Sequence, residues 1–242
     1  MRIMTFNIQH ALDYKNQKID IDLFIRKIKQ YGADICGLNE VRGEGPVEGY
    51  TDQTNAIADG LNNNRYFGEA IKVKGTSPYG NAVVTSYHIK SSETILIPEP
   101  SEEYKYDDYG DAIYYERRCV IKAVVDADGK DLCILVCHMG LSDIERKNAV
   151  ATLCGIIDNI EIPLVLMGDF NTTPDDEVLQ PLYECLSDTN EKSVNPSVAT
   201  YPSYSPEIKI DYIFYRGLDC VRAQTVEEII SDHYPIIADF EF

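Results

Sequence analysis

The sequence predicts a strand-rich α/β fold in which helices cover packed sheets. Short apolar segments rich in β-branched residues, typical of buried strands, recur along the 242-residue chain. Between them stand segments with the +3 and +4 apolar spacing of helices, near 20–31, 52–63 and 142–160. No repeat, linker or low-complexity segment interrupts this series, so we expect one domain that spans residues 1–242.

The N-terminal half is predicted to begin with a strand and a helix. Residues 2–8 form an apolar segment that stops at Asn7, and residues 20–31 show helical spacing before Gly32. A short buried strand at 33–38 then leads to Glu40. The other elements predicted for this half are a helix at 52–63 and strands at 66–73, 81–87 and 88–97, with a turn from Gly75 to Gly80.

The C-terminal half is predicted to be richer in strands. Its long helix begins at Ser142, because Glu145 three residues later completes a Ser-x-x-Glu capping box. An apolar strand that follows Pro163 ends at Asp169. The other predicted elements are a hairpin of strands 112–126 and 131–138, a short helix after Pro174, and strands at 209–215, 220–228 and 235–242.

The charge of the chain argues against a nucleic-acid partner. The formal net charge is 22 − 40 = −18, whereas proteins that bind nucleic acid normally present basic patches to the phosphates. A bound divalent cation can still attract a phosphate locally, so nucleic acid stays open as a substrate. Residues 98–111 add six acids against one lysine. We expect them to form a solvated loop, the alternative being a tyrosine-lined lid.

Cysteine usage favours a reducing compartment. The seven cysteines are scattered without a Cys-x-x-Cys pair, and an odd number excludes complete disulfide pairing. We interpret them as reduced core thiols of a cytoplasmic protein. The N-terminus shows no signal-peptide pattern, and no stretch approaches the roughly 18 apolar residues of a membrane span.

Polar side chains gather where the predicted strands end. A carboxylate such as Glu40, directly after a buried strand, is costly unless it is exposed, paired or bound to a cation. Magnesium prefers hard oxygen ligands, and Asn7 at the end of the first strand can supply an amide oxygen. Each residue alone fits a strand cap or a turn equally well, so this pair only suggests a metal site.

Two further segments carry groups suited to a phosphate ester. In Gly168-Asp169-Phe170-Asn171, strand alternation would place Asp169 and Asn171 on one face. The carboxylate can then orient a water while the amide donates to a phosphate oxygen; the alternative is an Asx turn. Arg118 could clamp a phosphate or pair with Glu116, and the sequence favours the ion pair.

The histidines differ in their surroundings. His233 follows Asp232, which could reach a metal while His233 faces the phosphate, and Asp211 is a candidate to fix the histidine tautomer. His138 ends a predicted strand, where it could donate a hydrogen bond to phosphate. We assign His88, inside an apolar segment, a structural role.

Six short motifs occur in a characteristic order. They are Thr5-Phe6-Asn7-Ile8, Leu38-Asn39-Glu40-Val41, His138-Met139-Gly140-Leu141, Gly168-Asp169-Phe170-Asn171, Ile210-Asp211-Tyr212-Ile213 and Ser231-Asp232-His233. On these motifs the chain resembles, along essentially its whole length, the endonuclease/exonuclease/phosphatase superfamily of metal-dependent phosphoesterases, in particular its compact bacterial members. The resemblance implies a four-layer α/β sandwich of two mainly antiparallel sheets, packed face to face with helices outside.

The resemblance also implies roles for site residues. Glu40 would be the main ligand of Mg²⁺ or Mn²⁺, assisted by Asn7 and Asp232. Asp169 would position or activate the attacking water, with Asn171 beside it.

The remaining implied roles concern the phosphoryl oxygens. The Asp211–His233 pair and His138 would stabilise the negative charge that grows there, with Arg118 near the same phosphate. His10 resembles a histidine of the compact bacterial members and is a further candidate for phosphate binding.

The chain departs from the family pattern at two positions. Asn39 stands where the family often has glutamine, and Gln9 stands where the abasic-site endonuclease branch has an acid. The second departure argues against a second metal and against repair activity.

The sequence therefore predicts a divalent-metal-dependent hydrolase of phosphate esters that uses in-line attack by water. Its substrate would be a small phosphodiester, a phosphomonoester or a phospholipid headgroup; a nuclease acting on DNA or RNA is the alternative. A catalytically silent binding module would have lost Glu40, Asp169 or His233, and all three are present. A zinc hydrolase would need a close ligand spacing such as His-x-x-x-His, which is absent from the sequence.

Overall fold

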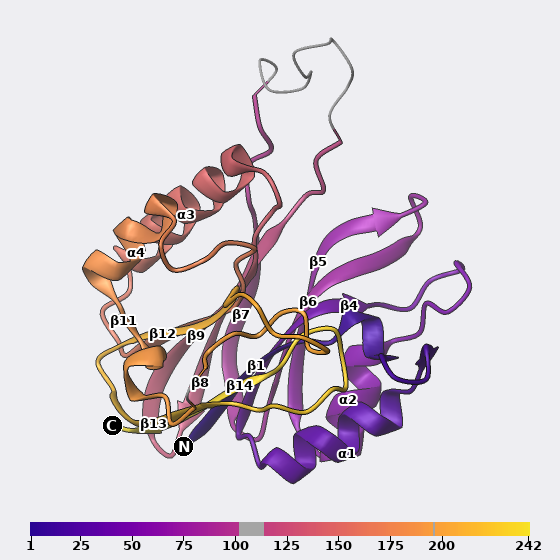
Figure 1. Ribbon diagram of the computed structural model, residues 1–242, viewed down its shortest axis with the longest axis horizontal. Coiled ribbons are helices and arrows are strands. Elements are labelled where there is room, and N and C mark those ends of the chain that lie inside the picture. Colours follow the sequence, from indigo (N-terminus) through magenta and orange to yellow (C-terminus); the bar gives the residue numbers. More distant parts are fainter. Residues whose placement is uncertain (102–113, 196) are drawn as a thin grey trace.

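Two six-stranded sheets pack face to face in the computed structural model, which describes residues 1–101, 114–195 and 197–242 (Figure 1). In spatial order the first sheet contains β13 (Asp219–Thr225), β14 (Ile236–Glu241), β1 (Arg2–Asn7), β4 (Ile35–Arg42), β6 (Ser77–Thr85) and β5 (Asn64–Val73). The second contains β11 (Ser187–Asp188), β12 (Asp211–Arg216), β10 (Leu164–Asp169), β9 (Lys130–His138), β8 (Cys119–Ala127) and β7 (His88–Leu96).

Each sheet holds one parallel pair of strands near its centre. These pairs are β1 with β4 and β9 with β10. The other neighbours run antiparallel. The prediction of two mainly antiparallel sheets is therefore confirmed.

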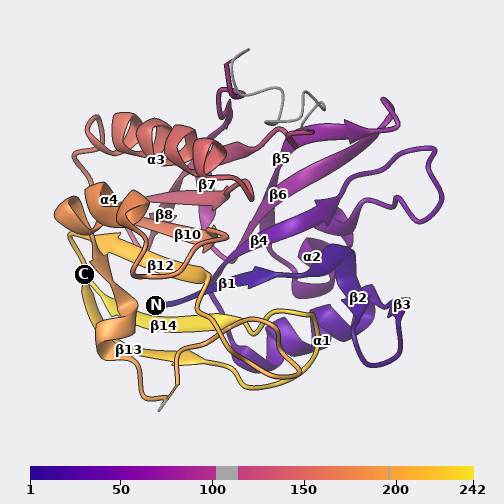
Figure 2. The same ribbon diagram turned by 45° about the horizontal axis from the view of Figure 1, so that its top comes forward.

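Helices form the two outer layers. α1 (Ile21–Tyr31) and α2 (Gln53–Leu61) cover the first sheet, and α3 (Asp143–Ile157) and α4 (Gln180–Cys185) cover the second (Figure 2). Three apolar clusters correspond to the three layer interfaces: one under α1 and α2, one between the sheets, and one under α3 and α4. The four-layer sandwich is thus confirmed, because each amphipathic face is buried against a neighbouring layer.

Local signals set the ends of the helices. The Asp20 side chain accepts a hydrogen bond from Leu23 N, and Gly32 ends α1 in the left-handed conformation at φ 68°. Ser142 and Glu145 form the predicted reciprocal capping box of α3.

Several predicted strand boundaries differ from the structure. The strand predicted at 112–126 begins only at Cys119, and residues 112 and 113 of that range lie outside the described residues. β12 begins at Asp211 rather than at 209, β13 ends at Thr225 rather than at 228, and β6 begins at Ser77 inside the predicted turn. Apolar pattern locates a strand, but hydrogen bonds to neighbours decide where it ends.

The shortest elements were not predicted. They are the hairpin β2 (Leu12–Asp13) and β3 (Lys18–Ile19), the strand β11, and the single turns η1 (Gln9–Ala11) and η4 (Thr189–Lys192); the helix predicted after Pro174 appears as η3 (Glu177–Leu179) followed by α4. Elements of two to four residues are too short to show a periodic pattern.

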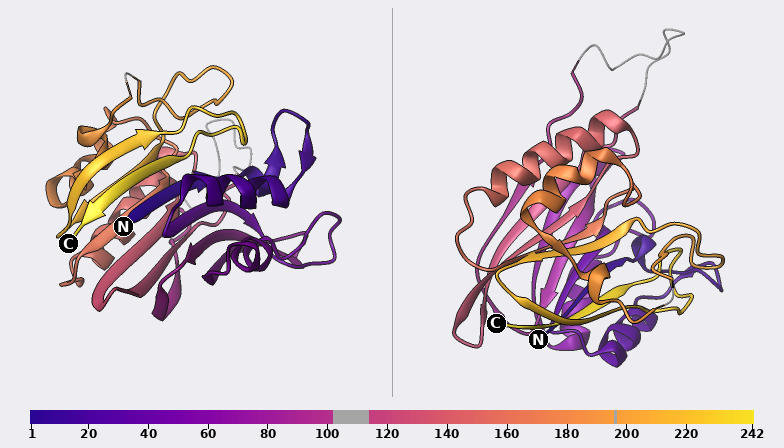
Figure 3. Two further views of the ribbon diagram at one scale, coloured as in Figure 1. Left: turned by 90° about the horizontal axis from the view of Figure 1, so that it is seen from below. Right: turned by 60° about the vertical axis from the view of Figure 1, so that its left-hand side comes forward.

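The chain ends lie side by side at one end of the sandwich (Figure 3). The Met1 amino group donates to Phe240 O at 3.1 Å.

None of the helices in the described part of the chain is long and apolar enough to cross a membrane. Of the acidic segment 98–111, residues 102–111 lie outside the described residues, so the loop prediction is not tested there.

Candidate active site

Both parallel strand pairs end at the same edge of the sandwich. Asn7 ends β1, and Asp169 and His138 stand opposite each other at the ends of β10 and β9. At this edge lies a cavity of about 500 Å³ whose lining includes seven predicted site residues: Glu40, Arg118, His138, Asp169, Asn171, Asp232 and His233. Asn7 and Asp211 contact these residues without lining the cavity. The remaining lining residues are Tyr79, Glu116, Leu141, Tyr201, Ile208 and Ile210.

Glu40 reaches the cavity because β4 carries a bulge. The register with β6 shifts between Leu38 and Val41, and Glu40 itself adopts φ 59°. A bulge re-aims a side chain that strand alternation would otherwise send to the opposite face. The carboxylate accepts hydrogen bonds from Tyr79 Oη at 2.9 Å and from Asn7 Nδ2 at 3.1 Å.

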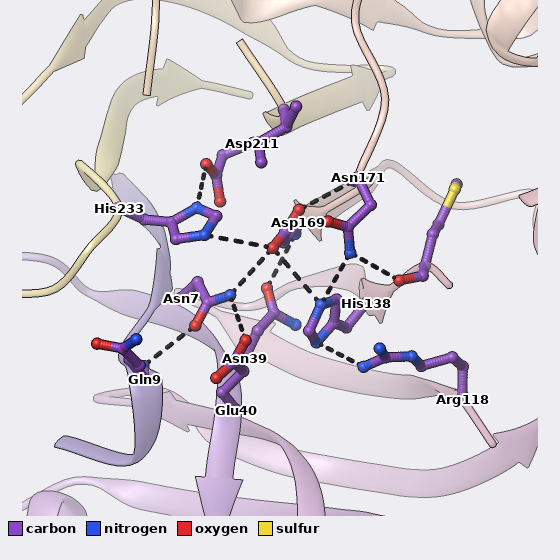
Figure 4. Close-up of polar contacts among 12 residues, drawn as sticks. Asn7, Gln9, Asn39, Glu40, Arg118, His138, Asp169, Asn171, Asp211 and His233 are labelled. Atoms are coloured by element: carbon purple, nitrogen blue, oxygen red, sulfur yellow. Dashed lines mark hydrogen bonds and ion pairs between the residues drawn. The ribbon is translucent and has the colours of Figure 1, made fainter. Parts of the chain in front are cut away.

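Asn7 lies between two carboxylates. Its Nδ2 donates to Glu40 Oε1 and also to Asp169 Oδ2, at 3.0 Å, while its Oδ1 accepts from Gln9 N at 3.1 Å (Figure 4). Gln9 Nε2 donates in turn to Asp232 Oδ2 at 2.9 Å. The three predicted metal-binding residues therefore belong to one connected group of side chains.

Asp169 is the buried centre of the site. Its Oδ1 accepts from Asn171 N at 2.9 Å, and its Oδ2 lies 3.5 Å from His138 Nε2 and 3.6 Å from His233 Nε2. Burial raises the pKa of Asp169 to about 7, with Asp211 adding to the shift, while His233 and the hydrogen bonds from Asn171 and Asn7 oppose it.

His233 is paired with Asp211 as predicted. His233 Nδ1 lies 2.8 Å from Asp211 Oδ2, which directs Nε2 toward Asp169. Burial lowers the pKa of His233, but the charges of Asp211, Asp169 and Asp232 outweigh it and raise the pKa to about 10. The Tyr201 ring packs on the imidazole with centroids 4.8 Å apart.

His138 presents a donor beside Asp169. Arg118 Nη1 lies 3.1 Å from His138 Nδ1, and a guanidinium only donates, so this contact favours the neutral tautomer with its hydrogen on Nε2, which also faces Asp169 Oδ2 at 3.5 Å. Burial and the charges of Arg118 and His233 hold the pKa of His138 well below its usual value. Asn171 Nδ2 lies 3.1 Å from Nε2 and also donates to Met139 O. Two donors thus lie together, and an anionic oxygen is an acceptor that suits both.

The structure corrects the reason given for Asn171. β10 ends at Asp169, so strand alternation does not place Asn171; a turn with φ 51° at Asn171 does. The Asx turn considered as the alternative is therefore present, and it still places Asn171 beside Asp169. The Arg118–Glu116 ion pair favoured by the sequence is present, at 2.9 Å, and it lies in the cavity lining.

Two histidines are not part of the cavity lining. His10 stands on η1, outside the cavity lining; burial lowers its pKa, with Arg42 adding to the shift and Glu40 opposing it. His88 is exposed on β7, the edge strand of the second sheet, and is not among the residues that line the cavity.

Sequence reasoning missed Gln9, Tyr79 and Glu116 as members of the site. Gln9 was noted only as a departure from an acid, and Glu116 only as a partner of Arg118. Tyr79 precedes Gly80 and Asn81 in a strand that carries no motif, so no sequence signal distinguished it. Its role depends on β6 lying beside the β4 bulge.

The donor set fits a hard divalent cation. The cavity lining holds four carboxyl groups. Burial raises the pKa of Asp232, His233 opposes this, and the negative charge of Glu40 adds to it. Gln9 Oε1 is buried beside Asp232 without a hydrogen-bond partner in the described part of the chain. Oxygen donors of this kind suit Mg²⁺ or Mn²⁺. Asp169, Asp211 and His233 also offer atoms within 4.8 Å of one another, but His233 Nδ1 is already bound by Asp211.

Comparisons with known proteins agree with this architecture. A model of the Endonuclease/Exonuclease/phosphatase family matches residues 4–233. A UPF0294 protein of Vibrio campbellii is 26% identical over 96 residues, which are 40% of this chain and 34% of that protein. The match therefore spans about a third of that relative's length.

Two solved structures share the fold. An endonuclease/exonuclease/phosphatase from Beutenbergia cavernae has a TM-score of 0.80 and 23% identity, covering 100% of this chain and 71% of that one. The mannosyl-6-phosphatase of Bacteroides thetaiotaomicron has a TM-score of 0.77 and 14% identity, covering 100% of both chains.

The chain thus has a four-layer α/β sandwich with an acidic cavity at the ends of its parallel strands, and it shares this fold with both solved structures. The family match includes the segments that carry Glu40, His138, Asp169 and His233. The chain belongs to the Endonuclease/Exonuclease/phosphatase family, whose members are hydrolases of phosphate esters, including nucleic acids.

Proposed function

We propose that this protein is a divalent-metal-dependent hydrolase of small phosphate esters. The observation that supports it most is the composition of the cavity: four carboxyl groups face one guanidinium and two imidazoles. Such an excess of acids repels an anionic phosphate unless a cation is bound among them. The same cavity holds Arg118 and the paired donors His138 and Asn171, which suit phosphoryl oxygens.

Glu40 and Asp232 would hold Mg²⁺ or Mn²⁺, with the amide oxygen of Asn7 as a further ligand. When bound, the ion would neutralise charge on the phosphoryl group and favour deprotonation of water. Gln9 orients Asp232, and Tyr79 orients Glu40, through the hydrogen bonds described above.

The remaining residues act on the water and the phosphate. Asp169, held by Asn7 and by the Asn171 amide, orients the attacking water and accepts its proton. His138 Nε2–H and Asn171 Nδ2–H donate to a phosphoryl oxygen, and Arg118 binds a second one. His233, aligned by Asp211, stabilises the charge that develops as the ester oxygen leaves.

We infer a small substrate rather than a polynucleotide. The net charge of −18 disfavours a long polyanion, and Glu116 in the lining adds an acceptor that suits hydroxyl groups of the leaving alcohol. The mannosyl-6-phosphatase that shares the fold supports a small phosphomonoester as the substrate. We retain His10 as a candidate contact for the part of the substrate beyond the phosphate.

The seven free cysteines support a cytoplasmic location.

The test is hydrolysis of p-nitrophenyl phosphate, bis-p-nitrophenyl phosphate and supercoiled plasmid, each with Mg²⁺, Mn²⁺ or EDTA. We expect metal-dependent turnover of the small esters that is lost in Asp169→Ala. Preferential plasmid cleavage would support the nuclease alternative. Absence of both turnover and metal binding would favour the silent binding module.

A further inference from the structure

Two buried asparagines lie directly beneath the cavity, in the interface between the sheets. Asn39 is on β4 and Asn81 on the neighbouring β6, with exposed fractions of 0% and 2%. Asn39 Nδ2 donates to Asn81 Oδ1 at 2.9 Å. The apolar cluster between the sheets surrounds this level with aliphatic side chains, so a buried amide pair there requires an explanation.

The pair reaches three adjacent strands of the second sheet. Asn39 Nδ2 also donates to Cys137 O on β9 at 3.1 Å, and Asn39 Oδ1 accepts from Asp169 N on β10 at 2.9 Å. Asn81 Nδ2 donates to Cys119 O on β8 at 3.1 Å. The donors and acceptor of Asn39 are all engaged, so turning its amide over would place like groups against each other.

Each of these contacts touches the backbone next to a site residue. Cys137 precedes His138, Cys119 follows Arg118, and the Asp169 amide belongs to the central carboxylate itself. Asn39 precedes Glu40 inside the β4 bulge, and Asn81 lies opposite that bulge. The amide pair therefore links the backbone under the metal-binding half of the site to the backbone under the phosphate-binding half.

Gly168 permits this arrangement. It adopts φ 145°, and a Cβ there would lie 1.8 Å from Cys137 O and 3.2 Å from Asn39 Oδ1. The close approach of β9 and of the Asn39 amide to this backbone thus requires glycine.

We propose that the Asn39–Asn81 pair positions the two halves of the active site relative to each other. Apolar contacts between sheets are not directional, whereas hydrogen bonds constrain both distance and angle. The pair sets the separation of Glu40, from the first sheet, and Asp169 and His138, from the second. This inference rests on the proposed function, and the asparagines act through these residues without touching the substrate.

The test compares Asn81→Ala with Thr85→Val. Thr85 is the buried last residue of β6; its hydroxyl donates to Asp34 O at 3.0 Å and accepts from Tyr87 N at 3.1 Å, so its variant also loses hydrogen bonds. We expect Asn81→Ala to lower kcat by about 10²-fold with little change in KM, because a shift of about 1 Å has such an effect. Thr85→Val should lose stability and keep kcat.

Two further variants sharpen the result. Asn39→Ala combined with Asn81→Ala should be no slower than Asn39→Ala alone, because the two residues act as one unit. Asn81→Ser keeps a polar hydroxyl, one atom shorter than the amide, and should lie between wild type and Asn81→Ala; it also serves if Asn81→Ala does not fold.

A readout independent of turnover is the backbone amide signal of Asp169 in nuclear magnetic resonance. In Asn81→Ala or Asn81→Ser its chemical shift and hydrogen-exchange rate should change, and in Thr85→Val they should not. Unchanged kcat together with an unchanged Asp169 amide would overturn the proposal. If the wild type hydrolyses no phosphate ester, the proposed function fails, and the amide signal alone decides whether the pair positions Asp169.

Discussion

Glu40 combines a charged side chain with a left-handed backbone conformation. A non-glycine residue at φ 59° is uncommon, and such conformations cluster where a side chain must be aimed. Only Tyr79 and Asn7 provide hydrogen bonds to its carboxylate in the described part of the chain, and both leave it facing Asp232 across an acidic cavity. Under the proposed function, these carboxylates repel one another until a cation binds between them.

Replacement of Glu40 by glutamine tests this directly. Glu40→Gln should lower metal-dependent turnover by at least about 10²-fold, since a ligand charge is lost while the shape is kept. Wild type should gain about 2.7 kcal/mol of stability from Mg²⁺ at 100 times its Kd, and the variant should not. Thermal melts with Mg²⁺ or EDTA measure this gain. A Glu40→Gln variant that melts much earlier than wild type in EDTA would instead make Glu40 structural.

His233 allows a second test at the residue scale. His233→Ala should lower kcat far more than it raises KM, because the Asp211–His233 pair acts on charge that develops in the transition state. Steady-state kinetics separates the two constants. Tyr201→Phe, which keeps the ring contact with His233, is the control and should retain kcat. A rise in KM at unchanged kcat would assign His233 to ground-state binding.

Individual elements contribute to the site through their ends. The parallel pairs β1–β4 and β9–β10 deliver Asn7, Glu40, His138 and Asp169 to one edge, and the antiparallel neighbours begin there with Asp211 and the segment before β14. α3 lies just behind, starting five residues after His138 and covering the outer face of the second sheet. Its stability therefore supports the strand ends that carry His138 and Asp169, the groups proposed to act on the phosphate and the water.

The α3 capping box provides a prediction at the element scale. Ser142→Ala should destabilise the protein by about 1 kcal/mol, which lowers Tm by roughly 2–4 °C in a chain of this size. Ser142→Thr, which keeps a hydroxyl that can accept from Glu145 N and donate to Glu145 Oε2, should restore most of the loss. Urea denaturation checks both variants. Equal stability of wild type and Ser142→Ala would show that packing of the buried face alone holds the start of α3.

Six of the seven cysteines pack in the three apolar interfaces that hold the layers together. All seven cysteines are free, and Cys36, Cys119, Cys133, Cys137 and Cys220 are buried. Burial raises the pKa of Cys36 to about 12, with the charge of Asp34 adding to the shift, and burial raises that of Cys119 to about 12 despite its neighbours. These thiols act as small apolar groups, and only Cys154 and Cys185 are partly accessible.

Raised thiol pKa values predict alkaline destabilisation. The folded state keeps protons that the unfolded chain releases near its ordinary thiol pKa of 9.0, so stability is full below that pH and falls as pH rises toward 12. Lys209, whose pKa burial lowers to about 8, has the opposite effect, but it is one group against five buried thiols.

Urea midpoints at pH 8, 9 and 10 under reducing conditions measure this trend. Cys36→Ala should show a shallower fall than wild type. In the native state a thiol reagent should label Cys154 and Cys185 alone, and all seven cysteines after unfolding. Rapid native labelling of Cys36 would contradict the burial that underlies the prediction.

Much of the fold could be predicted because its signals are local. Apolar segments, the Ser142 capping box and Gly32 located the long helices and most strands, since each depends on neighbours along the chain. Strand ends such as Cys119 and Asp211 were misplaced because they depend on partners from distant segments. The proposal of a single domain over 1–242 agrees with apolar clusters that combine residues from both halves of the chain.

The sequence by itself determined which chemical groups are available: the carboxylates, amides and imidazoles at strand ends, in an order that identified the family. Only the tertiary structure decided how they meet. It aimed Glu40 through a bulge, placed Asn171 through a turn, brought Tyr79 and Glu116 into the cavity, and linked Asn39 to Asn81. The physical reason is that hydrogen bonds and charge act over a few ångströms in space, and those distances exist only once both sheets have packed.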